Sequence, residues 1–148
     1  MIYLRAMKDK SFYGYVASGL NKAEDLNCAE TMLHAANRAY GLGLSPESLK
    51  LAAGFGGGMG FEGLCGVLTG GSMVLSAMFV QQRGHESELI KQLNREFVDA
   101  FRARMNSVDC APLKDLWRKD DVGCLPVILE GAELLQRIID RELAAKSR

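Results

Sequence analysis

The chain has 148 residues, of which 48 % are hydrophobic and 24 % are charged. These proportions are those of an ordinary globular domain, and they exclude a disordered chain. Eighteen basic and eighteen acidic residues cancel to a formal net charge of zero, so the charge gives no indication of binding to nucleic acid or to an anionic membrane. The length suits one domain that extends over residues 1–148.

The first ten residues lack the continuous apolar stretch and the small-residue cleavage site of a secretory signal. We therefore expect the protein to lie in the cytoplasm, where stable disulfides are rare. Residues 63–82 carry no charge and are long enough to cross a bilayer. However, the stretch contains four glycines and is flanked by Glu62 and Arg83. This composition is more typical of a buried central helix, and we expect no membrane insertion.

Apolar residues recur at helical spacing along most of the chain, without alternating strand patterns. Asn27, with Glu30 three residues later, forms a capping-box pattern, and Ser45 before Pro46 is a typical helix start. The predicted helices cover residues 4–20, 27–40, 45–53, 64–82, 86–105 and 125–143, with a short further segment at 111–117. The predicted fold class is all-α: a single-domain bundle of five to six helices with a glycine-rich loop.

The four cysteines are Cys28, Cys65, Cys110 and Cys124. They include no CxxC pair, which argues against a zinc ribbon and a thioredoxin-type dithiol. Buried cysteines commonly act as small hydrophobic residues, but these four share a location. Each lies within about one turn of a predicted helix N-terminus, where unpaired backbone N–H groups and the helix dipole favour the thiolate form.

A charge comparison supports a cluster at these positions. An oxidised two-iron, two-sulfide centre held by four thiolates carries a net charge of about minus two. Four converging helix N-termini would offer about plus two in partial charge. The four cysteines are therefore candidate metal ligands, and a [2Fe–2S] cluster is the favoured cofactor.

The glycine-rich loop has two interpretations that the sequence leaves open. Gly56, Gly57 and Gly58, together with Gly66 directly after Cys65, could let the backbone approach a cofactor and donate N–H groups to sulfur. The same glycines could instead make a sharp turn and close helix packing. Residues 58–63 also fit the GxGxxG dinucleotide pattern, but a capped helix precedes them instead of the required strand, so we exclude nucleotide binding there.

Several segments are arranged as in a known family. They are Asn27–Glu30, Ala53–Gly60 and Cys65–Gly70, followed by Cys110 and Cys124. Over residues 23–128 the chain resembles the C_GCAxxG_C_C family of small redox-active proteins. A related helical domain occurs in split-Soret cytochromes, which add haem-binding motifs that this chain lacks.

The resemblance implies which residues carry the family's function. Its four cysteines fall at Cys28, Cys65, Cys110 and Cys124, and its glycine motif falls at Cys65, Gly66 and Gly70. The sequence departs from the motif at Val67, where the family has Ala, and this change enlarges a packing position without removing a ligand. The implied function is that of a redox-active or iron–sulfur-binding protein.

The sequence leaves three hypotheses for the function. In the first, four cysteinates hold an iron–sulfur cluster for electron transfer or redox sensing, with an as yet unknown redox protein as partner. In the second, two cysteines of low pKa form a reversible disulfide. In the third, the protein is a structural zinc-binding or metal-free interaction domain. Enzymatic activity and assembly into a homo-oligomer are left open.

Overall fold

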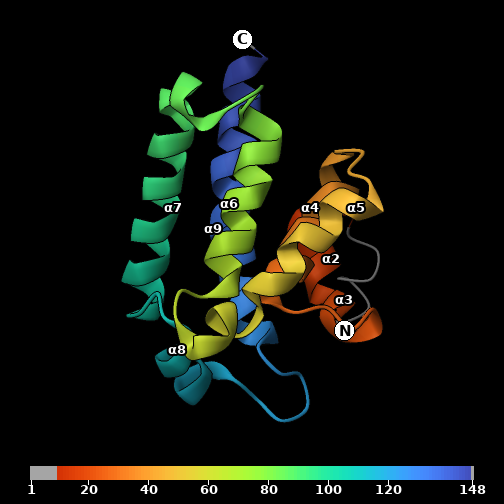
Figure 1. Ribbon diagram of the computed structural model, residues 1–148, viewed down its shortest axis with the longest axis vertical. Coiled ribbons are helices and arrows are strands. Elements are labelled where there is room, and N and C mark those ends of the chain that lie inside the picture. Colours follow the sequence, from red (N-terminus) through yellow and green to blue (C-terminus); the bar gives the residue numbers. More distant parts are fainter. Residues whose placement is uncertain (1–9, 148) are drawn as a thin grey trace.

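The computed structural model describes residues 10–147, and this part of the chain is an all-α domain (Figure 1). Its eight α-helices are α2 (Phe12–Ala17), α3 (Leu20–Ala23), α4 (Cys28–Tyr40), α5 (Pro46–Leu49), α6 (Gly66–Phe79), α7 (Glu88–Met105), α8 (Cys110–Trp117) and α9 (Leu125–Lys146). Shorter helical turns are η1 (Lys50–Phe55), η2 (Gly58–Glu62) and η3 (Gly84–Glu86). Within residues 10–147 there is no strand, so the predicted fold class is confirmed.

The predicted helix starts at Asn27 and Ser45 are confirmed. The Asn27 side chain accepts a hydrogen bond from the Glu30 backbone N–H at 2.9 Å, and the Asn27 N–H donates to the Glu30 carboxylate at 3.1 Å. This reciprocal pair begins α4 and therefore fixes the position of Cys28. Ser45 likewise accepts a hydrogen bond from the Ser48 N–H and begins α5.

The predicted helix over residues 4–20 is not continuous. Residues 4–9 lie outside the described residues, and the remainder is divided between α2 and α3 by Gly19, whose φ of 89° is left-handed. A left-handed residue cannot continue a right-handed helix. Because α3 and α5 are single turns of four residues each, the described part has more α-helices than the five or six predicted.

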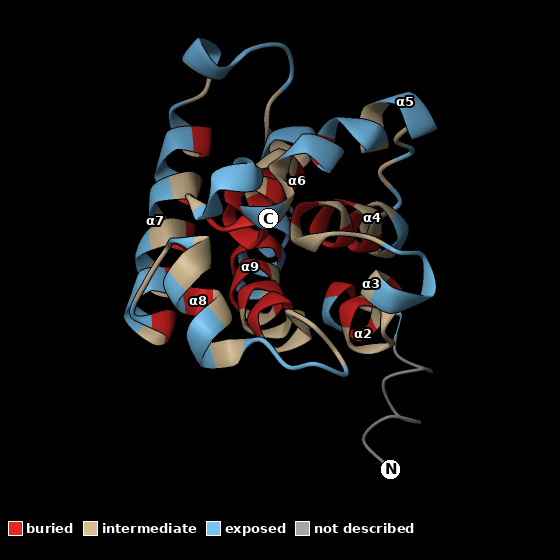
Figure 2. Ribbon diagram, turned by 60° about the horizontal axis from the view of Figure 1, so that its bottom comes forward, coloured by how far each residue is buried: buried red, intermediate tan, exposed pale blue. Residues whose placement is uncertain are grey.

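Helix α6 lies at the centre of the bundle, between α4, α7 and α9 (Figure 1). The faces that these helices turn toward one another are buried (Figure 2). A side chain at Gly70 would place its Cβ 2.6 Å from the Ala29 carbonyl oxygen, so α6 and α4 pack backbone against backbone. This confirms the predicted role of the uncharged stretch, although α6 ends at Phe79 instead of residue 82. Of the helices in residues 10–147, none has the length and hydrophobicity needed to cross a membrane.

The glycine-rich stretch was predicted to be non-helical, but part of it forms short helical turns. The 3-10 helix η1 extends to Phe55, and residues from Gly58 to Glu62 form a wide turn. The backbone has positive φ angles at Gly57, Gly58 and Gly60, and glycine adopts these readily, so the chain can turn here. The turn leads directly into Cys65 and the start of α6.

Candidate functional site

All four cysteines lie at helix N-termini, as the sequence predicted. Cys28 and Cys110 are the first residues of α4 and α8, whereas Cys65 and Cys124 are the N-cap residues of α6 and α9. The starts of α6 and α9 and the helix α8 lie at the same end of the molecule (Figure 1). The fold therefore brings together residues that are far apart in the sequence.

The four cysteine side chains line one small cavity of about 20 Å³. A cavity of this volume has room for about one water molecule. Cys65 is buried at 4 % exposure and the other three cysteines are half-buried. The rest of the lining consists of Gly57, Gly58, Gly66, Leu113, Lys114 and Val127.

At two of the lining glycines, the lack of a side chain lets the backbone lie close to a cysteine. A Cβ at Gly58 would lie 2.9 Å from the Cβ of Cys110, and one at Gly66 would lie 3.2 Å from the Cβ of Cys28. Gly56 is not among the lining residues. Its missing side chain leaves room for the Asn27 amide, which a Cβ would approach to 2.6 Å. The packing alternative is therefore favoured at Gly56, while cofactor contact by Gly57, Gly58 and Gly66 stays a prediction.

Backbone hydrogen bonds fix Cys65 and Cys110 side by side. The Cys65 N–H donates to the Val108 carbonyl at 2.8 Å, and the Cys110 N–H donates to the Gly63 carbonyl at 2.7 Å. These two bonds form a short antiparallel bridge between Leu64 and Asp109. The bridge sets the separation of the α6 and α8 starts.

Cys124 is held by a tight loop between α8 and α9. Lys119 and Gly123 exchange two backbone hydrogen bonds of 3.0 and 2.7 Å, and Gly123 has a φ of 61°. From α3, the Asn21 amide donates to the Val122 carbonyl at 3.5 Å, and the Lys22 ammonium donates to the Asp121 carbonyl. Helix α3 thus supports the loop that carries Cys124.

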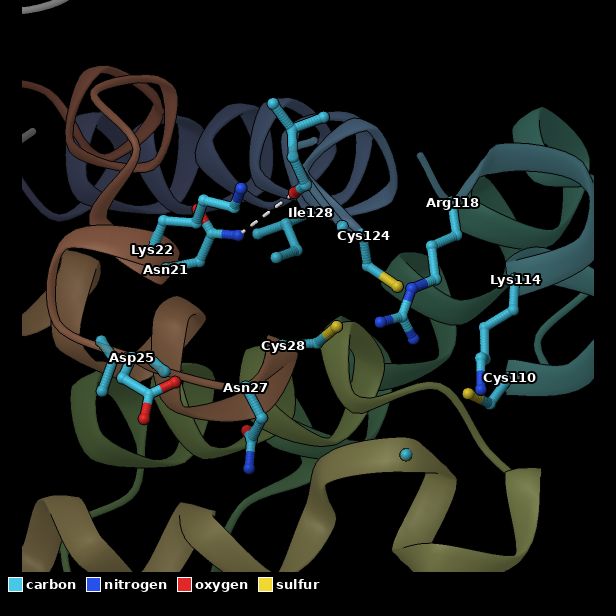
Figure 3. A pocket seen from close by; sticks show the side chains of 14 residues that line it. Asn21, Lys22, Asp25, Asn27, Cys28, Cys110, Lys114, Arg118, Cys124 and Ile128 are labelled. Atoms are coloured by element: carbon cyan, nitrogen blue, oxygen red, sulfur yellow. Dashed lines mark hydrogen bonds between the residues drawn. The ribbon is translucent and has the colours of Figure 1, made fainter. Parts of the chain in front are cut away.

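The side chains of Cys28 and Cys124 point toward each other (Figure 3). A hydrogen-bonding interaction between them is the largest cause that lowers the pKa of Cys124 to about 6, and the charges of Arg118 and Lys114 lower it further. The same interaction, followed by burial, raises the pKa of Cys28 well above its usual value. Within the pair, these interactions favour ionisation of Cys124 over ionisation of the more enclosed Cys28.

Cys65 and Cys110, like Cys28, do not follow the expectation that a helix N-terminus favours the thiolate form. Burial raises the pKa of Cys65 to about 11, and the N–H groups of Val67 and Leu68 oppose this only in part. Burial also raises the pKa of Cys110, against the charge of Lys114. Removal of the sulfur from water thus outweighs the helix dipole at these positions.

A larger cleft of about 360 Å³ opens beside the small cavity (Figure 3). Cys28, Cys110 and Cys124 line both spaces, whereas Cys65 lines only the inner one. Lys114 and Arg118 also line the cleft, and the sequence patterns considered above did not indicate them. Lys114 follows Cys110 by four residues on α8, a spacing that places the two on one face of the helix and could have identified Lys114. Arg118 is the residue directly after α8.

The site matches an iron–sulfur cluster in the kind and number of its donors but not in their present spacing. Four soft thiolate donors are the usual ligands of such clusters. However, no three His, Cys, Asp or Glu side chains within residues 10–147 are arranged as a group that could hold a metal ion. The small cavity is also too small for two irons and two sulfides. Three of the four cysteines also line the cleft, so the open space beside the cysteines lies on that side.

The fold and the site together define an all-helical protein with a four-cysteine centre at its helix N-termini. The chain belongs to the family described as "Putative redox-active protein (C_GCAxxG_C_C)", which matches residues 26–138. The matched region contains all four cysteines and the glycine-rich loop. A search of curated proteins and a search of solved structures gave no match.

Proposed function

We propose that this redox-family protein holds an iron–sulfur cluster, most simply [2Fe–2S], on Cys28, Cys65, Cys110 and Cys124, for electron transfer or redox sensing. The observation that carries the proposal is that four cysteines from four helix starts line a single cavity. Isolated buried cysteines in a hydrophobic core have no reason to gather in this way. When bound, such a cluster supplies a one-electron redox centre.

The surroundings of the cavity support this proposal electrostatically. Four helix N-termini surround it, and each offers roughly half a positive charge. Lys114 lines the cavity itself, and Arg118 lines the adjoining cleft. These charges would offset the net charge of about minus two of an oxidised four-thiolate centre. Leu113 and Val127 would keep water from the buried side.

The test is to prepare the protein without oxygen in the presence of iron and sulfide. We expect visible absorption and a stoichiometric content of iron and sulfide. Replacing any one of the four cysteines with Ser should weaken or abolish both, because a thiolate ligand is lost. Melting curves of each metal-free variant would separate lost ligation from lost folding. A colourless, iron-free wild-type protein under these conditions would contradict the proposal, and about one zinc per chain would indicate a zinc site instead.

A second candidate function is thiol–disulfide exchange, favoured by the facing side chains of Cys28 and Cys124 (Figure 3). The Cys124 thiolate would attack a substrate disulfide, form a mixed disulfide and release one thiolate. Cys28, after loss of its proton, would then attack the Cys124 sulfur, form the Cys28–Cys124 disulfide and release the second substrate thiol. The protein dithiol is oxidised as the substrate disulfide is reduced.

The two candidates make different predictions for the same set of variants. In thiol–disulfide exchange, Cys28→Ser should accumulate a mixed disulfide through Cys124, because the resolving thiol is missing. Cys65→Ser should remain active in this reaction. A cluster instead requires all four cysteines, so Cys65→Ser should then be as defective as Cys28→Ser.

A further inference from the structure

The large cleft beside the cysteines has an excess of positive charge. Its lining includes Lys22, Lys114 and Arg118, and Asp25 is the only acidic side chain among the lining residues. The chain as a whole has a formal net charge of zero, so the excess is local. A concave surface with one sign of charge concentrates ligands of the opposite sign.

Arg118 is unusual among the arginines that the structure describes. Within residues 10–147, every other arginine has a carboxylate partner, as the ion pairs of Arg38, Arg83, Arg95, Arg102, Arg104, Arg137 and Arg141 show. Arg118 is the one arginine of the described chain whose guanidinium makes neither a salt bridge nor a hydrogen bond with another described residue. Instead it extends into the cleft, between Cys124 and Cys110 (Figure 3).

The other basic side chain near Arg118 is that of Lys114, and it forms only a weak ion pair. The Lys114 ammonium lies 3.4 Å from the Glu62 carboxylate, at a partly exposed position. It therefore retains N–H donors that can reach a ligand in the cleft. By contrast, the Asn27 side chain is already satisfied, because its oxygen accepts from Glu30 and its amide donates to the Ala53 carbonyl. The unpaired donors of the cleft are thus cationic, and the buried Asn21 side-chain oxygen is an unpaired acceptor at its lining.

We propose that this cleft binds a small molecule that carries an oxyanion, a carboxylate or a phosphate, with Arg118 as its main anchor and Lys114 beside it. A planar guanidinium matches both groups through two parallel hydrogen bonds. A volume of about 360 Å³ is within the range of small-ligand sites. The bound anion lies against the open side of Cys28, Cys110 and Cys124. Its binding does not require a cluster.

The experiment is calorimetric titration of the full-length reduced protein, both metal-free and loaded with iron and sulfide. The probes are malonate and inorganic phosphate, each added in a low-salt buffer that contains neither group. We expect saturable binding of at least one probe at one site per chain. Binding of malonate alone identifies a carboxylate site, and binding of phosphate alone identifies a phosphate site.

Substitutions at two neighbouring basic residues, Arg118 and Lys119, test whether Arg118 anchors the anion. Arg118→Gln should weaken binding at least about tenfold, because hydrogen bonds to the charged group are lost. Arg118→Lys should bind at an intermediate level, since it keeps the charge but not the paired donors. Lys119→Gln is the matched control: it removes the same charge from the next residue, which is exposed and does not line the cleft.

Several results would overturn the proposal. They are the absence of saturable binding of both probes, equal binding by Arg118→Gln and the wild type, or equal losses in Arg118→Gln and Lys119→Gln. The last result would indicate general charge attraction instead of a site. A protein that takes up no iron but still binds an anion through Arg118 would exclude the cluster and leave this site standing.

Discussion

Cys28 and Cys124 have the same chemistry but different surroundings, which shift their pKa values in opposite directions. Cys124 lies toward the open cleft, where Arg118 and Lys114 stabilise a negative charge. Cys28 is more enclosed, so a charge there would be costly. Cys124 is therefore the more acidic thiol of the pair before any ligand or substrate binds.

This difference in acidity predicts an order of reactivity in the reduced, metal-free protein. Cys124 should be the first cysteine to react with iodoacetamide and Cys65 the last, because the thiolate is the nucleophile. With a Cys124 pKa of about 6, its alkylation rate should rise as the pH increases through about 6 and then level off at neutral pH. Mass spectrometry of peptides after short exposures would measure this order. Uniform rates that rise only toward pH 9 would contradict it.

Some properties of individual residues could be predicted from the sequence, and others could not. Caps and a first-turn proline are local signals, so the positions of Cys28 and Cys124 at helix starts were predictable. Burial depends on what the rest of the chain places over a side chain. For that reason the raised pKa values of Cys65 and Cys110, against the expected effect of the helix dipole, could not be predicted.

At the level of elements, the contact of α4 with α6 holds the site together. Cys28 begins one of these helices and Gly66 the other. Their backbones approach closely at Ala29 and Gly70. The uncharged, glycine-containing composition of residues 63–82 predicted a buried central helix, but the direction in which α4 crosses it was not encoded in any local pattern.

Replacing Gly70 with Ala should destabilise the protein by about 1–3 kcal/mol. The new Cβ would lie 2.6 Å from a backbone oxygen, and backbone cannot rotate away as a side chain can. Urea unfolding of the two proteins would measure the difference. Gly84→Ala is a suitable control, because a Cβ there meets nothing within 4 Å. Equal losses in both variants would mean that the α4–α6 contact is not tight.

An ion pair between α7 and α9 predicts a dependence of stability on pH. Arg141 contacts both carboxylate oxygens of Glu96, at 2.5 and 2.8 Å, and this contact lowers the pKa of Glu96. A carboxyl group with a lowered folded-state pKa contributes its full stabilisation above its unfolded pKa. That contribution is lost as the pH falls through the folded-state pKa.

Glu96→Gln should therefore lower the free energy of unfolding by only about 0.5 kcal/mol at pH 7, because the pair is exposed and screened by solvent. The difference from the wild type should shrink toward zero near pH 3 and in high salt. Urea unfolding at both pH values measures it. Glu88→Gln, which alters a more exposed pair with Lys91, should have a smaller effect. A loss for Glu96→Gln that persists unchanged at pH 3 would assign the effect to packing instead of charge.

At the scale of the whole molecule, the site exists only because four helix starts meet at one end of the bundle. Helix type and approximate extent follow from apolar spacing, which is why the all-α class was predictable. The position of the Cys124 loop depends on contacts from Asn21 and Lys22, about one hundred residues earlier in the chain. Such long-range contacts have no signature in a single sequence, so the adjoining cleft could not be predicted.

A site built from four separate helices links cofactor binding to global stability. A ligand that binds only the folded chain stabilises it by mass action, by about 2.7 kcal/mol at a concentration one hundred times its dissociation constant. Under the cluster proposal, anaerobic loading with iron and sulfide should therefore raise the Tm by roughly 5–10 °C. Differential scanning calorimetry of loaded and metal-free protein would measure the shift, and the loss of colour should follow the unfolding transition.

The Cys65→Ser variant decides how this shift should be interpreted. Cys65 lines the inner cavity but not the cleft where Cys28 and Cys124 face each other. Because the substitution can alter packing by itself, the quantity to compare is the difference in Tm between treated and untreated protein of the same variant. A cluster requires Cys65, so the shift on loading should disappear in this variant.

A Cys28–Cys124 disulfide would close a long loop and stabilise the fold on oxidation. The rise in Tm on oxidation should therefore persist in Cys65→Ser and vanish in Cys28→Ser. A loading shift that survives in Cys65→Ser would therefore exclude the four-cysteine cluster.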